Sequence, residues 1–361
     1  MNLVVDLSPL LIRSAGIKGY LYYWYRALCA ETKVDSFPAL GPLGDLDHEH
    51  GMAPAWRLAQ VHFARLTRGL SLPTCDVFHA TNMMLGGPRR AKLTTTLHDI
   101  TSWKTPEHHT EANRRLDASF AERILRRADG IIAVSENTRR DAIEVLHVDP
   151  DKIRTIHSGV AEAFFAASNQ DAAAMAEKYR LRKPYVLFVG TLEPRKNIDR
   201  LLDAWQSLQE ADAELVIAGP TGWASAGTLE RLNNGVRRLG YVPERDLPGL
   251  TKGAALLAYP SLYEGFGFPV AQAMACGVPV LTSNVSSLPE VAGGGALLVD
   301  PMSVDDIRCG LRSLLDSPGL RETLGAAGRR RAECYRWSRC ARESLQFFSE
   351  VAGATTRKSH A

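Results

Sequence analysis

The feature that most constrains the fold is a repeated alternation of short apolar segments with longer helical patterns. The first series places its apolar segments at residues 3–6, 75–80, 93–99, 130–135 and 152–159. The second series continues at 185–190, 214–219, 236–242, 255–261, 278–283 and 296–301. Between them lie segments with helical patterns, such as 21–30, 111–128 and 136–146. Strands that alternate with helices predict an α/β fold with doubly wound parallel sheets.

Two such series predict two domains. The 361 residues exceed what one core usually organises and suit two α/β domains of ordinary size. A polar, alanine-rich stretch at 161–183 separates the series, so we place the boundary near residue 180. This gives Rossmann-like domains at 1–180 and 181–336, a last helix at 337–352, and a disordered tail at 353–361.

Composition narrows the class of protein. The formal net charge is only +3, which does not call for a nucleic-acid partner. No segment has the roughly 18 consecutive apolar residues of a membrane span, and the start MNLVVDLSPL does not resemble a signal peptide. The six cysteines form no CxxC pair, so we expect neither a zinc site nor a disulfide framework. We expect a cytoplasmic protein.

The most informative motif is YEGFGFPVAQAMACGVPV at 263–280, which follows a strand and leads into a helix. Gly265 and Gly267 allow backbone N–H groups to approach an anion at a helix N-terminus. Glu264 stands where a carboxylate can accept hydrogen bonds from sugar hydroxyls, and Gln272 is expected on the first helical turn, within reach. Taken alone, glycines after a strand more often serve only the turn, but the whole string favours a ligand site.

Three further segments resemble parts of the same kind of site. FVGTLEPRKNID at 188–199 runs from a strand through a basic turn into a helix. LHDITSWKT at 97–105 begins at the carboxyl end of a strand, where open α/β sheets bind ligands. SAGIKGY at 14–20 is a glycine-containing turn after the first strand. It lacks the G-x-G-x-x-G fingerprint that NAD binding requires.

Together these strings resemble the signatures of retaining glycosyltransferases of family four. That family has the GT-B fold, in which two Rossmann-like domains face a central cleft. The resemblance covers nearly the whole chain and is strongest from residue 185 to 300. It implies transfer of a sugar from a nucleotide diphosphate donor to a hydroxyl, with retention at the anomeric carbon. No metal or other cofactor is implied, and the last helix is expected to pack back on the N-terminal domain.

The resemblance also assigns roles to residues. Glu264 would hold the donor sugar, and His98 would position it from the other domain. Arg195 and Lys196 would bind the diphosphate, where two cations stabilise the negative charge of the leaving group. Gln272 stands where relatives have a second glutamate, which accepts hydrogen bonds from the ribose. The donor-binding residues implied are Gly16, Gly19, Gly190, Arg195, Lys196, Gly219, Val242 (beside the base), Gly265, Phe266, Gly267, Phe268 and Gln272. The acceptor-binding residues implied are Asp99 and Trp103.

The donor and acceptor are inferred from resemblance alone. The strings look most like bacterial mannosyltransferases of polysaccharide assembly, so GDP-mannose is the first choice, before GDP-rhamnose and a UDP-hexose. The acceptor would be a growing lipid-linked O-antigen or exopolysaccharide. Two alternatives remain: a UDP-sugar epimerase of the same fold, and a non-catalytic partner in a transferase complex, which Gln272 makes plausible.

Several other clusters have simpler explanations. Asp149 and Asp151 have DxD spacing but suit a turn, and the pair Asp45 and Asp47 is set aside as a metal site too. The clusters at 48–50 and 108–109 are expected to be surface residues and not metal ligands. Ser135 is expected to cap the following helix. The basic residues on the helical segment 111–128 accompany apolar Leu116, Phe120, Ile124 and Leu125, so this helix packs on its own domain or contacts an anionic membrane. The basic residues are Arg114, Arg115, Arg123, Arg126 and Arg127.

Overall fold

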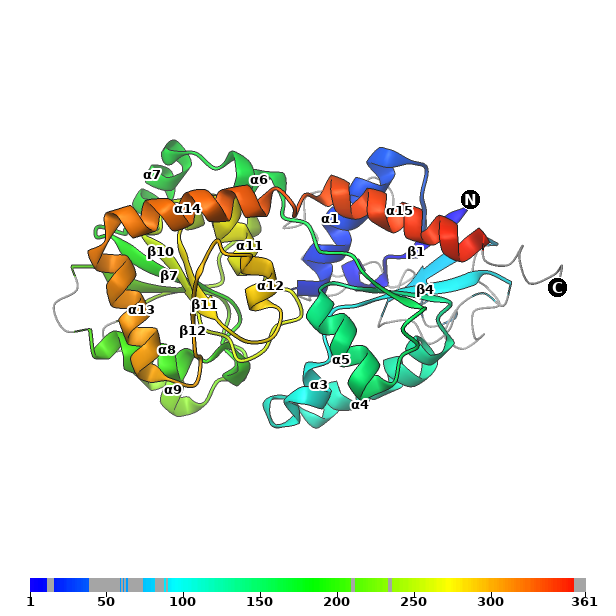
Figure 1. The fold of residues 1–361 in the computed structure, drawn as a ribbon, viewed down its shortest axis with the longest axis horizontal. Helices are drawn as coiled ribbons and strands as arrows, with labels where there is room; N and C mark the ends of the chain where they lie inside the picture. Colours follow the sequence, from blue (N-terminus) through cyan, green and yellow to red (C-terminus); the bar gives the residue numbers. More distant parts are fainter. Residues whose placement is uncertain are drawn as a thin grey trace. The chain divides into compact units, whose positions relative to one another are not determined.

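A computed structural model describes residues 1–11, 16–38, 74–81, 90–208, 212–232 and 236–353, with isolated positions 59, 61, 63 and 88. Residues 45–50, Ser14 and Ala15, and the tail after residue 353 lie outside the described residues. The described chain divides into two compact units (Figure 1). Unit 1 contains the chain up to Gly159 together with the chain from Trp337 onward, and unit 2 contains Val160–Arg336.

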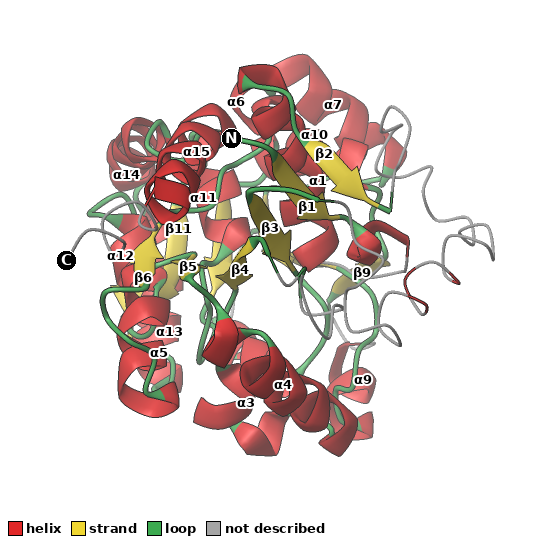
Figure 2. Ribbon diagram, turned by 90° about the vertical axis from the view of Figure 1, so that its right-hand side faces the viewer, coloured by secondary structure: helices red, strands yellow, loops and turns green. Residues whose placement is uncertain are grey.

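Unit 1 is built on a parallel sheet whose described strands lie in the order β2-β1-β3-β4-β5-β6. Figure 2 shows β2, β1, β3 and β4 side by side. The strands are β1 (Leu3–Asp6), β2 (Asp35–Phe37), β3 (Val77–Ala80), β4 (Lys92–Leu97), β5 (Gly130–Ala133) and β6 (Ile153–Thr155). The helices of its described part include η1 (Ser8–Leu11), α1 (Gly16–Glu31), α3 (Thr101–Lys104), η3 (Pro106–His108), α4 (Glu111–Arg123), η4 (Leu125–Arg127), α5 (Glu136–Leu146) and α15 (Trp337–Gly353).

Unit 2 repeats the design, with described strands in the order β12-β11-β10-β7-β8-β9, again parallel. The strands are β7 (Tyr185–Val189), β8 (Glu214–Ala218), β9 (Arg237–Gly240), β10 (Leu256–Tyr259), β11 (Val280–Ser283) and β12 (Leu297–Val299). The helices before β9 are α6 (Glu162–Ala166), α7 (Asn169–Lys178), η5 (Pro194–Lys196), α8 (Ile198–Gln206) and α9 (Ala226–Leu232). Those after it are η6 (Glu244–Asp246), α10 (Leu247–Lys252), α11 (Phe268–Ala275), α12 (Leu288–Ala292), α13 (Val304–Asp316) and α14 (Pro318–Ala332).

The prediction of doubly wound parallel sheets is confirmed. Each predicted apolar segment overlaps an observed strand. The central strands β7 and β10 are almost wholly buried, as parallel strands covered on both faces must be. One strand, β2, was not predicted, because its three residues have no apolar run. It is a strand only because it pairs with the edge of β1.

The division between the units differs from the expected boundary near residue 180. Residues 160–180 belong to unit 2, because α7 packs against α10 and α6 contacts both α10 and α11. The last helix, α15, belongs to unit 1 and packs against α1 (Figure 1). Trp24 of α1 joins the two helices through its indole N–H, which donates to Ser344 Oγ at 3.1 Å.

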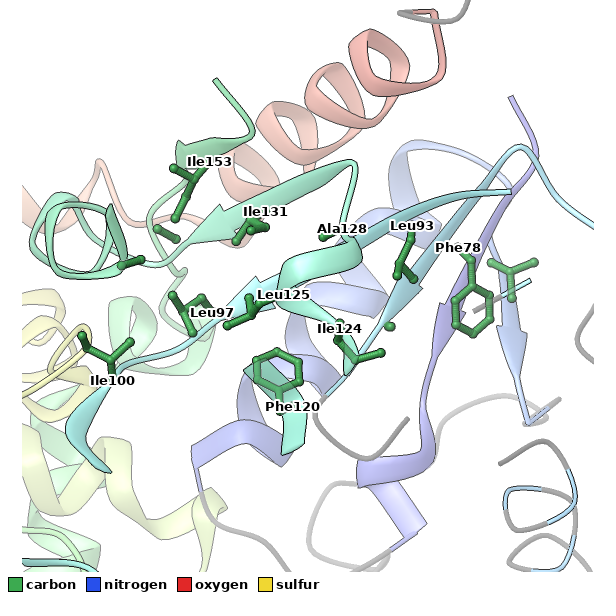
Figure 3. Close-up of a cluster of buried hydrophobic side chains, with 14 residues drawn as sticks. Phe78, Leu93, Leu97, Ile100, Phe120, Ile124, Leu125, Ala128, Ile131 and Ile153 are labelled. Atoms are coloured by element: carbon green, nitrogen blue, oxygen red, sulfur yellow. The ribbon is translucent and has the colours of Figure 1, made fainter. Parts of the chain in front are cut away.

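Most of the apolar side chains of α4 and of the residues just after it point into unit 1 and not toward solvent. Phe120, Ile124 and Leu125 are buried in a cluster with residues of β3, β4 and β5 (Figure 3). Leu116 is the exception, since it remains 67% exposed. The apolar face expected for this segment is therefore mostly core. No helix in the described part of the chain has the length and apolar composition needed to cross a bilayer.

Candidate active site

The strand order of unit 2 reverses between β7 and β10, because β7 is followed by β8 on one side and paired with β10 on the other. At such a switch point the connections leave in opposite directions and open a crevice at the carboxyl ends of the strands. The loop after β7 contains Arg195 and Lys196, and the loop after β10 contains Glu264. The topology therefore brings together two motifs that are 68 residues apart.

Glu264 lies at the centre of a buried polar cluster. Its Oε1 accepts hydrogen bonds from Lys196 Nζ at 2.7 Å, Ser261 Oγ at 2.7 Å and Tyr259 OH at 2.9 Å. Its Oε2 pairs with Arg195 Nη1 at 2.9 Å. Only 7% of Glu264 is exposed, so both carboxylate oxygens are engaged inside the folded unit. Glu264 thus holds the side chains of Arg195 and Lys196 in place.

The charges of the cluster shift the pKa values of its members. Burial raises the pKa of Glu264, but Arg195 and Lys196 outweigh that effect and lower it to about 2. Burial, and then the neighbouring Arg195, lowers the pKa of Lys196, against the opposing effect of Glu264. Glu264 is therefore ionised at neutral pH. The ring of Tyr259 lies 5.0 Å from Lys196 Nζ, which adds a cation–π contact.

The basic turn is held by its own backbone geometry. Asn197 adopts a left-handed conformation with φ of 60°, which ends the 3-10 turn η5 and starts α8. Its side-chain amide donates to the carbonyls of Pro260 at 2.9 Å and Pro301 at 2.7 Å. These bonds tie the turn after β7 to the loops that follow β10 and β12, and so they fix the position of the turn that contains Arg195 and Lys196.

Two glycines of the site are required by the fold itself. A Cβ on Gly219 would lie 1.9 Å from the carbonyl oxygen of Gly190, so the ends of β7 and β8 approach too closely for any side chain there. Gly267 starts α11 with φ of 92°, a conformation that favours glycine. Gly265 is buried in the same loop.

The structure also gives the positions of the remaining residues expected to bind the donor. Gln272 is the fifth residue of α11 and not on its first turn, because the helix begins at Phe268. Val242 is only 5% exposed. Phe266 is also buried, with ring centroids 5.3 Å from both Phe268 and Tyr335, so these aromatics pack the base of the loop.

In unit 1, His98 directly follows β4, as expected. Its ring lies edge-on to Tyr20, with centroids 4.7 Å apart. Burial lowers the pKa of His98 to about 4, against a smaller opposing effect of Asp99, so the imidazole is neutral at pH 7. No hydrogen bond joins its ring nitrogens to the described residues.

The two acceptor candidates have internal contacts. Asp99 Oδ1 accepts from the backbone N–H of Thr101 at 3.0 Å and from its hydroxyl at 2.7 Å, which secures the start of α3. Trp103 is half-buried against the core cluster of unit 1. A turn was expected at Gly16 and Gly19, but both lie in the first turns of α1. A Cβ on either would meet no described atom within 4 Å.

The other clusters behave mostly as expected. Asp149 Oδ1 accepts from the backbone N–H of Asp151 at 3.0 Å, which confirms the turn. Ser135 caps α5 by accepting from Thr138 N at 3.0 Å, also as predicted. His108 and His109 are half-buried and not fully on the surface. Within the described ranges, no group of three or more His, Cys, Asp or Glu side chains is placed to hold a metal ion.

Sequence reasoning did not select Glu193, Tyr259 or Ser261, although all three contact the cluster. The sequence signal for these residues was a polar side chain in an apolar strand or in the loop just after it. Such a side chain becomes buried and therefore needs a hydrogen-bond partner. It also did not select Asp6, which is fully buried at the end of β1. Its carboxylate accepts from Ser8 N at 2.9 Å and from Thr81 N at 3.2 Å.

Known family models match both halves of the chain. The family model described as Glycosyltransferase Family 4 matches residues 20–164, and the one described as Glycosyl transferases group 1 matches residues 169–331. The chain is similar to the O-antigen chain mannosyltransferase B of Escherichia coli, with 35% identity over 282 residues, 75% of this chain and 74% of that protein.

Solved structures share the fold over nearly the full length of the chain. Sucrose-phosphate synthase from Thermosynechococcus elongatus superposes with a TM-score of 0.76 at 19% identity, covering 98% of this chain and 100% of that one. WaaG, a glycosyltransferase involved in lipopolysaccharide biosynthesis, superposes with a TM-score of 0.72 at 17% identity, covering 96% and 99%. At these identities the likeness concerns the fold, which is GT-B.

Proposed function

Because the chain belongs to glycosyltransferase family four and is a glycosyltransferase, we propose that it transfers a mannosyl residue from GDP-mannose to a hydroxyl of a growing lipid-linked polysaccharide. The observation that carries this proposal is the cluster of Arg195, Lys196 and Glu264 at the switch point of unit 2. The choice of mannose is supported by the name of the similar Escherichia coli protein, a mannosyltransferase of the O-antigen chain.

In this proposal, unit 2 binds the donor through its diphosphate. As the bond from the anomeric carbon to the phosphate oxygen breaks, negative charge accumulates on the diphosphate, and Arg195 and Lys196 stabilise it. The acceptor hydroxyl forms the new bond with retention at the anomeric carbon, and its proton passes to the leaving phosphate. We propose that these side chains and the N-terminus of α11 supply the positive field in place of a metal ion.

The polar contacts of Glu264 refine its proposed role. Its Oε1 accepts three hydrogen bonds, and its Oε2 pairs with Arg195. A carboxylate oxygen can accept more than one hydrogen bond, so Oε2 is proposed to accept one from a sugar hydroxyl beside its contact with Arg195. Within unit 1, neutral His98 is proposed to contact a substrate sugar, and the second oxygen of Asp99 is proposed to contact the acceptor.

A thermal-shift panel tests the donor. A ligand that binds only the folded protein stabilises it by mass action and so raises its melting temperature. At a ligand concentration a hundredfold above Kd, the free energy of unfolding increases by about 2.7 kcal/mol. We expect GDP and GDP-mannose to raise the melting temperature, and UDP, UDP-glucose and UDP-N-acetylglucosamine to leave it unchanged. Arg195→Ala is the matched variant in which the response to GDP should disappear.

The other outcomes of this panel are equally informative. A response to the UDP compounds alone would overturn GDP-mannose as the donor and would call for a search for epimer formed from the UDP-sugar alone. No response to any nucleotide would contradict catalysis and favour a non-catalytic partner. In that case Gln272→Glu, which restores the glutamate of relatives, is the next variant to compare.

We also propose that the protein acts in the cytoplasm, in peripheral contact with the inner face of the cell membrane, where a lipid-linked acceptor would lie. The support is the group of arginines on and after α4 together with exposed Leu116. Because most apolar side chains of this segment are buried, attraction to anionic lipid would rest mainly on charge. We expect the protein to co-sediment with vesicles containing phosphatidylglycerol at low salt and not with phosphatidylcholine alone. Equal recovery in both supernatants would contradict membrane contact.

A further inference from the structure

Arg195 lies between two carboxylates, and one of them belongs to a residue without an assigned role. Arg195 Nη1 pairs with Glu264 Oε2 at 2.9 Å and also donates to the carbonyl of Tyr263. Arg195 Nη2 donates to Glu193 Oε1 at 2.5 Å. Glu193 is 8% exposed, and its extended backbone, with φ of −139° and ψ of 151°, leads directly into η5.

The position of Glu193 fixes the guanidinium from the side that Glu264 does not reach. A bidentate arginine loses much of its rotational freedom when both terminal nitrogens are bonded. The 3-10 turn between Glu193 and Arg195 is closed by Lys196 N donating to the Glu193 carbonyl at 3.0 Å. Glu193 therefore contacts the cationic pair through its backbone and through its side chain.

Glu193 also changes the charge of the cluster. Arg195 and Lys196 contribute two cations, and Glu193 and Glu264 contribute two carboxylates, so the four side chains balance. Without Glu193 the cluster would have a surplus positive charge directly beside the proposed diphosphate site. In such a partly desolvated site, the interaction energy of two charges a few ångströms apart is several times the thermal energy.

The charge balance of these four side chains affects how tightly the site would hold the product of the proposed reaction. The donor diphosphate is esterified at both ends, whereas the released nucleoside diphosphate ends in a phosphate monoester. Its second ionisation has a pKa of about 6, so the product is the more negative species at neutral pH. A site with surplus positive charge would hold that product more tightly than the donor, and product release limits turnover in many enzymes.

We propose that Glu193 is a positioning residue for Arg195 whose negative charge weakens the site's hold on the nucleoside diphosphate, so that the product can leave. This inference rests on the proposed diphosphate-binding role of Arg195 and Lys196. It assigns to Glu193 an effect opposite to that of a residue needed only for structure. Removing its charge should tighten anion binding, whereas a purely structural loss should weaken it.

The test compares binding of inorganic pyrophosphate and GDP by calorimetry in wild type and Glu193→Gln. Glutamine keeps an acceptor for Arg195 Nη2 and removes the charge. We expect Kd for both anions to fall about tenfold, and kcat and KM for the donor to fall together. Glu193→Asp, which keeps the charge, should bind pyrophosphate as wild type does. Glu322→Gln, which removes an exposed carboxylate of α14 in the same unit, is the matched control.

Unchanged or weaker pyrophosphate binding in a folded Glu193→Gln protein would overturn the role of Glu193 alone. If that variant does not fold, as judged by its circular dichroism, Glu193→Ala provides the same comparison without an added amide. If wild type binds neither pyrophosphate nor any nucleoside diphosphate, then the proposed function fails together with this inference. The first result and the last are distinguished by whether wild type binds pyrophosphate.

Discussion

Replacing Lys196 by methionine is expected to lower kcat/KM for sugar transfer by about a thousandfold. Removing one preorganised donor to a developing anion typically costs about 10²–10³ in rate, and here a full positive charge is lost as well. Methionine has a similar length and an apolar end, so it can occupy the space beside Tyr259. The measurement is initial-rate kinetics with GDP-mannose and a saccharide acceptor.

The control is Lys183→Met, which removes a lysine that is 60% exposed and pairs with exposed Asp212 at 3.2 Å. It should leave transfer within about twofold of wild type, since exposed ion pairs contribute about 0–1 kcal/mol. Glu264 keeps Arg195, Tyr259 and Ser261 as partners in Lys196→Met, so the variant should remain folded. A folded variant with nearly unchanged kcat/KM would show that Lys196 does not stabilise the leaving group.

Replacing Trp24 by alanine is expected to reduce the free energy of unfolding of unit 1 by about 4 kcal/mol. Truncating a fully buried tryptophan loses its transfer free energy and leaves a cavity, which together typically cost about 3–5 kcal/mol. Trp24 is 0% exposed, and its ring packs against His79 and Phe348, with centroids 4.8 and 6.1 Å away. It also holds α15 through the hydrogen bond to Ser344.

Urea unfolding followed by circular dichroism measures this loss as a shift in the first transition that involves unit 1. Two-unit proteins need not unfold in one step, so each transition is fitted separately. Trp223→Ala is the matched control, because Trp223 is 42% exposed and its removal should cost less than about 1 kcal/mol. A loss below about 1.5 kcal/mol for Trp24→Ala would mean that α15 is not held on α1 by this side chain.

Much of the architecture follows from local patterns. The apolar segments predicted the positions of the strands, because a parallel strand buried on both faces must be apolar along its length. The strand-to-helix strings around Arg195 and Glu264 predicted two loops at the carboxyl edge of one sheet, since that is where such loops lie. The cap at Ser135 and the turn at Asp149 were also local, because each depends on side-chain oxygens that bond within three residues.

Tertiary structure decided how those local pieces combine. Arg195, Lys196 and Glu264 form one cluster only because β7 and β10 are neighbours, and strand order depends on pairing between distant segments. The burial of Glu264 and the place of Glu193 beside Arg195 have the same origin. Residues 160–180 joined unit 2 and α15 joined unit 1 because helices pack where complementary apolar faces meet, which no short window of sequence contains. The sequence by itself thus determined which elements form and which side chains their loops offer, while long-range packing decided which of those side chains share a site.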